Sequence, residues 1–275
     1  MSDHYYDPVA KEPRHFVEKK DGSGTRPSTI ADARKNNWLP SVTTVLKSLA
    51  KPALTEWLCR NAATAALTTP RIDGEPLDAF LERILRKDAT DESEKAKDLG
   101  TQIHDAIERS LTLPVYPESF KAYVEPVQSV LMPIGRVVWT ERILIGEGYA
   151  GKADALFESE EAVTLCDFKT TGKVPDKVYP EHKLQLSAYA KTLGNTGDKR
   201  IRTAIVYIST KEPGLVKLIY HDDWLETFSA GFRPLQQLWC WMNNYWPQPI
   251  AMLPTDFPHL KPTETKLVDV KEIIP

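Results

Sequence analysis

The residues best suited to chemistry fall in one stretch near the middle of the chain. In chain order they are Asp154, Asp167, Lys169, Gln185 and Tyr189. Asp167 and Lys169 are two residues apart in an apolar, strand-like run, so their side chains leave the same face. Gln185 and Tyr189 are four residues apart in a helix-like run and also share a face. Two carboxylates followed by a lysine and a glutamine suit metal-dependent cleavage of a phosphodiester.

A divalent cation is the expected partner of the two aspartates. Asp154 and Asp167 belong to successive strand-like runs, so a hairpin would bring the carboxylates side by side, where they repel unless a cation lies between them. Oxygen ligands favour Mg²⁺ or Mn²⁺, which also contact substrate phosphates. Such an ion lowers the pKa of a bound water and neutralises charge on the phosphoryl oxygens. Lys169 then supplies a fixed positive charge for the transition state.

The spacing of Asp167 and Lys169 is not specific by itself. The same carboxylate-x-lysine pattern occurs at Glu18 and Lys20, Glu181 and Lys183, Glu264 and Lys266, and Asp269 and Lys271. Surface ion pairs account for those four. The pair at 167 and 169 differs because it ends an apolar strand, follows a Gly-x-x-Asp strand and precedes a Gln-x-x-x-Tyr helix.

The apolar periodicity predicts a single α/β domain over residues 1–275, with a mixed central sheet flanked by helices. Residues 1–40 are expected to be an extended or hairpin-like lead-in outside the core, residues 41–133 a helical region, residues 134–246 the catalytic α/β core, and residues 247–275 a Pro-rich tail. The expected helices span 41–46, 54–65, 77–85, 93–111 with Ser93 as its cap, 117–131, 181–193 and 222–245. The expected strands span 137–145, 149–157, 163–168, 201–209 and 215–220.

Composition is that of a globular protein. The chain is 41% hydrophobic and 27% charged, which argues against disorder and against a fibrous repeat. It has neither an apolar run of the length needed to span a bilayer nor an N-terminal secretory signal, so we expect no membrane partner and a cytoplasmic location. The net charge is −3, yet residues 168–217 hold ten Lys or Arg and four Asp or Glu. A basic wall there could face a polyanion.

Taken together, the motifs resemble the RecB-like branch of the PD-(D/E)XK nuclease superfamily, over roughly residues 95–220. They are Gly100-x-x-x-His104, Gly151-x-x-Asp154, Asp167-x-Lys169 and Gln185-x-x-x-Tyr189. Upstream, residues 39–46 (Leu-Pro-Ser-Val-Thr-Thr-Val-Leu) and Lys51-Pro-x-Leu54-x-x-Trp57 further resemble phage-encoded exonucleases and mitochondrial genome maintenance exonucleases. The resemblance implies a restriction endonuclease-like core with a helical N-terminal region.

The resemblance also implies roles for individual residues. His104, Asp154 and Asp167, with the backbone carbonyl of Phe168, would bind the metal, although a lone histidine beside an apolar helix stripe is more often a boundary residue. Lys169 would be the catalytic lysine, and Gln185 and Tyr189 would help to place the attacking water or the DNA strand.

Two acidic residues are further candidates around the metal. Glu141 lies on the strand before the Gly-x-x-Asp motif and is a second-shell or second-metal candidate. Glu108, one turn after His104, is a second candidate, although a solvated helix face explains it more simply. Several relatives hold an iron–sulfur cluster with four cysteines; this chain has only Cys59, Cys166 and Cys240, so ligand count excludes a cluster.

The expected function is Mg²⁺- or Mn²⁺-dependent exonuclease action on DNA with a free end or a single strand, through a metal-activated water. The phage-like resemblance implies a role in phage DNA recombination, repair or replication in the bacterial host cytoplasm, and a single-strand annealing recombinase as a partner. Lys173, Lys177 and Lys183 are candidate phosphate contacts, or ordinary solvated lysines. Two alternatives stay open: a structure-specific or site-specific endonuclease, and an inactive nuclease-fold subunit that binds DNA.

Overall fold

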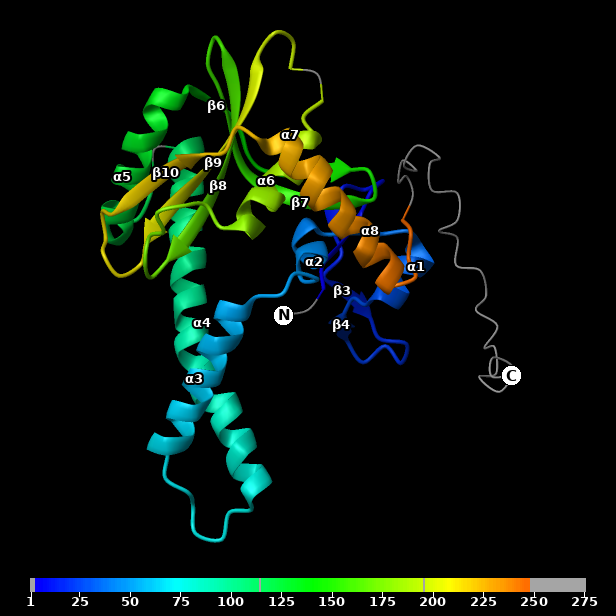
Figure 1. The fold of residues 1–275 in the computed structure, drawn as a ribbon, viewed down its shortest axis with the longest axis vertical. Helices are drawn as coiled ribbons and strands as arrows, with labels where there is room; N and C mark the ends of the chain where they lie inside the picture. The colour runs from blue at the N-terminus through cyan, green and yellow to red at the C-terminus, as the bar shows by residue number, and fades with distance from the viewer. Residues whose placement is uncertain (1–2, 114, 195, 248–275) are drawn as a thin grey trace, which may run out of the picture.

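The computed structural model describes residues 3–113, 115–194 and 196–247. Its centre is a five-stranded mixed sheet in the order β10-β9-β8-β7-β6, flanked by helices, which confirms the expected α/β class (Figure 1). The strands are β6 (Arg136–Gly146), β7 (Tyr149–Glu158), β8 (Ala162–Thr171), β9 (Arg200–Ser209) and β10 (Val216–Tyr220). Only the β8–β9 pair is parallel, and the connection between these strands runs through helix α6 (Pro180–Lys191).

Strand β8 is the centre of this sheet because its sequence suits burial on both faces. Its first seven residues, Ala162 to Phe168, are all buried, and they include the single charged residue Asp167. A run of this kind is typical of an interior strand with helices on both sides. The chemistry-bearing residues therefore lie at the end of the most deeply buried strand.

Two apolar clusters cover the two faces of the sheet. On one face, α4 (Leu77–Thr112) and α5 (Lys121–Leu131) contribute Ile103, Ile107 and Val127, which pack with Phe168. On the other face, α6 and α2 (Val42–Leu46) pack with the C-terminal helices, and Leu186 contacts the sheet there. Helices α4 and α6 thus approach the same strands from opposite sides.

Helix α4 corrects one expectation of the sequence analysis. Residues 77–85 and 93–111 were expected to form two helices with Ser93 as a cap, but they belong to one helix of 36 residues. The segment between them is polar and holds neither Gly nor Pro, so nothing in it ends a helix. The first half of α4 pairs with α3 (Pro52–Thr68) to form an arm that projects from the sheet (Figure 1).

The N-terminal segment also differs from the expected lead-in. It holds a helix and two small sheets, and it buries Tyr5, Ala33 and Leu39 completely. Residues of this kind are part of the core rather than outside it. The elements are β1 (Tyr5–Asp7), β2 (Glu12–Pro13), β3 (Phe16–Glu18), β4 (Thr25–Pro27), α1 (Ile30–Asn36) and β5 (Leu39–Pro40). Helix α2 then begins as expected, since Ser41 Oγ accepts a hydrogen bond from Thr44 N at 2.9 Å.

The C-terminal helix begins later than expected and contains a wide turn. Its parts are α7 (Trp224–Glu226), the π-helix η3 (Thr227–Phe232) and α8 (Arg233–Met242). Asp223 is the N-cap residue of α7, and the carboxylate of the preceding Asp222 pairs with Arg202. Two short 3₁₀ turns, η1 (Glu118–Phe120) and η2 (Met132–Ile134), flank α5. The expected Pro-rich tail lies outside the described residues from position 248 onward.

The three free cysteines differ in exposure. Cys166 and Cys240 are buried and Cys59 is exposed on α3. Within the part of the chain that the structure describes, no helix has the length and apolar character to cross a membrane.

Tyr245, which follows α8, connects this part of the chain to the N-terminal segment. Its hydroxyl lies 3.0 Å from Ala33 O and 2.8 Å from Trp38 O. We expect Tyr245→Phe to lower the free energy of unfolding by about 1 kcal/mol, because the hydrogen bonding of the Tyr245 hydroxyl to these two carbonyls is lost. Urea denaturation measures the change. The control is Tyr220→Phe on an exposed edge, where the ring keeps its contact with Arg202; equal losses in both variants would contradict the assignment.

Candidate metal centre

The candidate site forms where strands β7 and β8 part. Their antiparallel register runs from Glu158 opposite Val163 to Ala155 opposite Cys166, and Asp154 and Asp167 are the next residues on each strand. At that point Phe168 N donates a hydrogen bond of 2.6 Å to Asp154 Oδ2. A side-chain carboxylate therefore replaces the backbone acceptor of the ladder. Beyond it, β7 continues along β6 and β8 continues along β9, so both acids lie at the base of a fork.

Helix α4 places His104 at this fork. His104 Nε2 lies 2.7 Å from the backbone oxygen of Phe168, within hydrogen-bond distance. One turn earlier, a Cβ on Gly100 would lie only 2.7 Å from Thr170 Oγ1. The missing side chain at position 100 lets the helix approach β8 closely enough for the imidazole to reach the strand. This contact explains the Gly100-x-x-x-His104 spacing in physical terms.

Glu141 comes to the same place from strand β6. It lies in the register position opposite Asp154, between the pairs Thr140–Ala155 and Arg142–Ala153, and its backbone has φ of +50°. That left-handed conformation is costly for a residue with a side chain, and like charges on opposite strand positions repel. Ligand atoms of His104, Glu141 and Asp154 all lie within 4.8 Å of one another. The structure thus brings Glu141 next to two of the predicted metal ligands.

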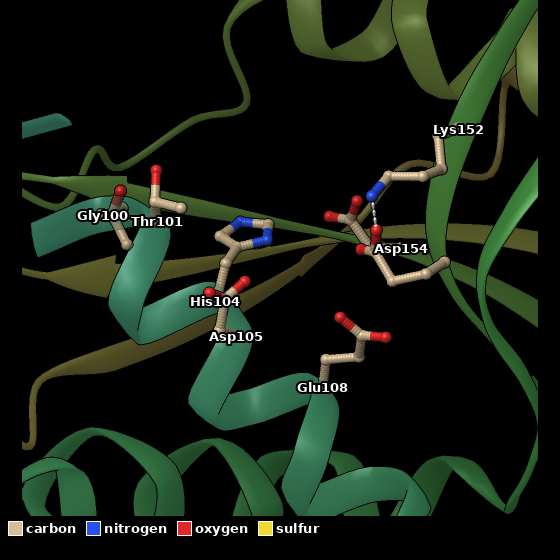
Figure 2. Close-up of a pocket in the computed structure, with 9 residues that line it drawn as sticks. Gly100, Thr101, His104, Asp105, Glu108, Lys152 and Asp154 are labelled. Atoms are coloured by element: carbon tan, nitrogen blue, oxygen red, sulfur yellow. Dashed lines mark ion pairs between the residues drawn. The ribbon is translucent and has the colours of Figure 1, made fainter. Parts of the chain in front are cut away.

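These residues line a pocket of about 410 Å³ (Figure 2). His104 and Glu108 project into it from one face of α4, and Lys152 and Asp154 project from β7 on the other side. The lining residues are Gly100, Thr101, His104, Asp105, Glu108, Glu141, Lys152, Asp154 and Thr170. Glu108 is therefore part of the pocket and not of an outward-facing, solvated helix surface.

Asp167 has different partners from Asp154. It is only 2% exposed, and its Oδ2 lies 2.6 Å from Lys169 Nζ. Its Oδ1 accepts a hydrogen bond from Gln185 Nε2 at 3.2 Å, and the same nitrogen lies 3.5 Å from Tyr189 Oη. The structure thus divides the predicted residues into two adjoining groups. His104 and Asp154 line the pocket, while buried Asp167, Gln185 and Tyr189 form a connected chain beside it that ends at the partly exposed Lys169.

The electrostatics of the fork favour a bound cation. Burial, followed by the charge of Asp167, raises the pKa of Asp154 to about 7, against the opposing effects of His104 and Lys169. Burial lowers the pKa of Lys169, but the carboxylates of Asp167 and Asp154 outweigh it and raise the pKa overall, so this residue is an ammonium. Burial raises the pKa of Tyr189 well above its ordinary value, so it stays a neutral phenol whose oxygen accepts from Gln185 Nε2. Two acids are thus confined where one cation would stabilise both.

The donor set fits a hard divalent ion. One imidazole nitrogen, the carboxylates of Asp154 and Glu141 and the Phe168 carbonyl offer mainly oxygen ligands, as Mg²⁺ and Mn²⁺ prefer. His104, Asp154 and Glu141 are therefore the residues that would hold the ion. Asp167 would be a further ligand only if its carboxylate contacted the ion and Lys169 at the same time.

The candidate DNA contacts lie outside this pocket. Lys173 and Lys177 are exposed on the segment that follows β8, and Lys183 is half-buried on α6. Sequence reasoning missed Lys152, which lines the pocket and forms an ion pair with Glu141. Strand periodicity could have identified Lys152 as a site residue, because it is two residues before Asp154 and so leaves β7 on the same face.

Gly151 shows how closely the two groups are packed. A Cβ at this position would lie 2.5 Å from Tyr189 Oη and 2.6 Å from Tyr189 Cε1. We expect Gly151→Ala to displace the ring, to weaken the Gln185 contact with Asp167, and to lower the free energy of unfolding by about 1–3 kcal/mol. Thermal or urea unfolding measures the loss.

The matched control is Gly172→Ala, where the added Cβ would meet only the flexible end of Lys211 at 3.3 Å. We expect that variant to stay within about 0.5 kcal/mol of the original protein. If Gly151→Ala is equally neutral, the ring of Tyr189 is not held in the place that the structure gives it.

The raised pKa of Asp154 predicts how stability depends on pH when no divalent ion is present. Between the ordinary carboxyl pKa near 3.8 and the folded-state value of about 7, the folded chain holds a proton that the unfolded chain has released. This group therefore makes the fold less stable as pH rises through that window. We expect Asp154→Asn to remove this part of the slope, as measured by urea denaturation in chelator from pH 4 to 8.

Divalent ions should offset this loss of stability at higher pH, because the ion competes with the proton on Asp154. Mn²⁺ affinity is expected to rise up to tenfold for each pH unit below about 7 and to level off above it. Calorimetric titrations at several pH values check this dependence. An affinity that stays flat from pH 5 to 7 would show that Asp154 is ionised without the metal.

Comparisons with known proteins leave the identity of the chain open. No protein-family model matches it, and no curated protein matches it. Among solved structures, one match is described as "Crystal structure of SSO0001", with 16% sequence identity and a TM-score of 0.32 over 67% of this chain and 83% of that one. A likeness at that level identifies neither a fold family nor a function. The function therefore has to be argued from the residues of the site.

Proposed function

We propose that this chain is a Mg²⁺- or Mn²⁺-dependent DNA exonuclease of the RecB-like branch of the PD-(D/E)XK superfamily. The observation that carries the proposal is the fork itself. Asp154 and Asp167 follow the last β7–β8 pair, Lys169 lies 2.6 Å from Asp167, and His104 reaches the peptide between them. Cation ligands beside a fixed ammonium suit metal-assisted hydrolysis of a phosphodiester.

A divalent ion held there would lower the pKa of a water and neutralise charge on the phosphoryl oxygens. The chain's own residues have separate tasks. Lys169 keeps its proton, because two carboxylates stabilise the ammonium, and so it can stabilise the negative charge that grows on the phosphate. Gln185 fixes the orientation of Asp167 through Oδ1 and leaves Oδ2 to the lysine.

Tyr189 supports this arrangement as a neutral group. Its ring fills the space beside Gly151, and its hydroxyl lies 3.5 Å from Gln185 Nε2. Because burial keeps it protonated, it can orient the glutamine amide but cannot act as a base. The attacking water would then give its proton to solvent or to a substrate phosphate oxygen, and no covalent intermediate is needed.

An inactive DNA-binding subunit is the less economical alternative. Asp154 is half-buried, and desolvation together with the charge of Asp167 raises its pKa to about 7, so its ionisation costs stability at neutral pH. A scaffold has no need to confine Asp154, Asp167 and Glu141 in one fork, whereas a cation site does. The resemblance of the sequence motifs adds three parts to this proposal. The enzyme acts on DNA ends, it serves phage DNA recombination, repair or replication, and its partner is a single-strand annealing recombinase.

The proposed activity is tested with end-labelled linear DNA and closed circular DNA, single- and double-stranded, with Mg²⁺, Mn²⁺ or chelator. We expect the metal to be required and the label to be released from linear DNA only. Cutting of closed circles would point to an endonuclease instead. Binding without any metal-dependent product from any substrate would overturn the enzymatic proposal.

Two substitutions test the assignment of the residues. Asp167→Asn and Lys169→Ala are each expected to reduce cleavage at least ~10²–10³-fold, while DNA binding in a filter or fluorescence assay survives. The control is Glu18→Gln with Lys20→Ala, which has the same carboxylate-x-lysine spacing on an exposed hairpin strand. Near-full activity in either site variant would mean that the chemistry is performed elsewhere.

A further inference from the structure

Lys152 is a charged residue of the pocket to which neither the motifs nor the proposed reaction gives a task. It leaves β7 on the same face as Asp154, and its ammonium forms an ion pair with the carboxylate of Glu141 (Figure 2). In the register its Cα partner is Ile143, so Lys152 and Glu141 are diagonal neighbours across β6 and β7. The pairing therefore follows from the strand geometry rather than from a loop.

The Lys152 ammonium lies among several carboxylates. Burial lowers the pKa of Lys152, but Glu141, Glu108 and Asp154 together raise it above its ordinary value, so three carboxylates stabilise its charge. At the other side of the fork, the Lys169 ammonium forms an ion pair with Asp167. The two lysines differ in access, because the Lys152 side chain is 53% exposed and the Lys169 side chain is 25% exposed.

Lys152 changes the net charge of the site. Five carboxylates surround the fork, from Asp105, Glu108, Glu141, Asp154 and Asp167, and two lysines oppose them. With every group ionised, the site has an excess of three negative charges, and one divalent ion neutralises two of them. Without Lys152 the excess would be four, which matches the charge of two divalent ions, and Glu141 and Glu108 would offer their oxygens to a second ion.

We propose that the Lys152 ammonium occupies the second cation position of this centre, beside Glu141 and Glu108, and thereby limits the site to one divalent ion. The inference rests on the proposed metal centre and extends it by assigning the ion count. Lys152 is thus a positioning residue: it holds the Glu141 carboxylate and excludes a second ion by occupying its place. One ion then remains, with His104, Asp154 and the Glu141 carboxylate that Lys152 also contacts.

The test counts ions and does not depend on cleavage. Mn²⁺ is titrated into the full chain by calorimetry at pH 8, and the bound ions are examined by electron paramagnetic resonance. We expect one Mn²⁺ per chain with the signal of an isolated ion. Lys152→Met, which keeps the length of the side chain without its charge, is expected to bind two Mn²⁺ with the signature of magnetic coupling between neighbouring ions. Lys152→Arg is expected to stay at one.

The control variant is Lys217→Met, which removes a lysine paired with exposed Asp176 away from the pocket and should leave the ion count at one. Circular dichroism checks that each variant folds. Two coupled ions in the original chain, or one ion in a folded Lys152→Met variant, would overturn the inference. If the protein cleaves DNA but Lys152→Met still binds one ion, this inference is rejected and the proposed nuclease activity stands. If the ion counts are as expected but no DNA is cleaved, the nuclease activity is rejected and this inference stands.

Discussion

The hydrogen bond from Phe168 N to Asp154 Oδ2 is the interaction on which the site depends. It occurs where the β7–β8 ladder ends, and it replaces a backbone acceptor with a carboxylate. Because a buried N–H must be satisfied, the carboxylate has to stay at the base of the fork. The same peptide presents its carbonyl to His104. One peptide unit therefore fixes the positions of a strand end, an acid and a histidine from a distant helix.

Two glycines allow the helices to close on this fork from opposite faces. Gly100 lets α4 approach Thr170, and Gly151 makes room for the ring of Tyr189 on α6. Each helix is held by its own apolar cluster, so the apolar burial on both faces offsets the cost of confining acids between them. The side chains of the fork stand on strands and helices that are also packed in the apolar core. A loop-borne site would lack this support.

Much of this arrangement could be predicted from the sequence, because strand alternation and helical spacing determine which side chains share a face. The order of the strands, the fork acids and the helix with Gln185 follow from such local patterns. The continuity of α4, the buried N-terminal segment and the position of Glu141 do not. Glu141 reaches the pocket through a left-handed backbone, and a periodic reading of β6 contains no signal for that distortion.

The two lysines of the fork solve different electrostatic problems, although both oppose carboxylates. Lys169 is paired with an acid that is 2% exposed, and it is locked by neighbours that include the Gln185–Asp167 contact. Lys152 is more exposed, and its ammonium lies in the pocket beside the Glu141 carboxylate. A buried ion pair is costly to break, whereas a partly solvated one is not. The Asp167–Lys169 pair is therefore the more costly of the two to separate, and the Glu141–Lys152 pair is the more easily rearranged.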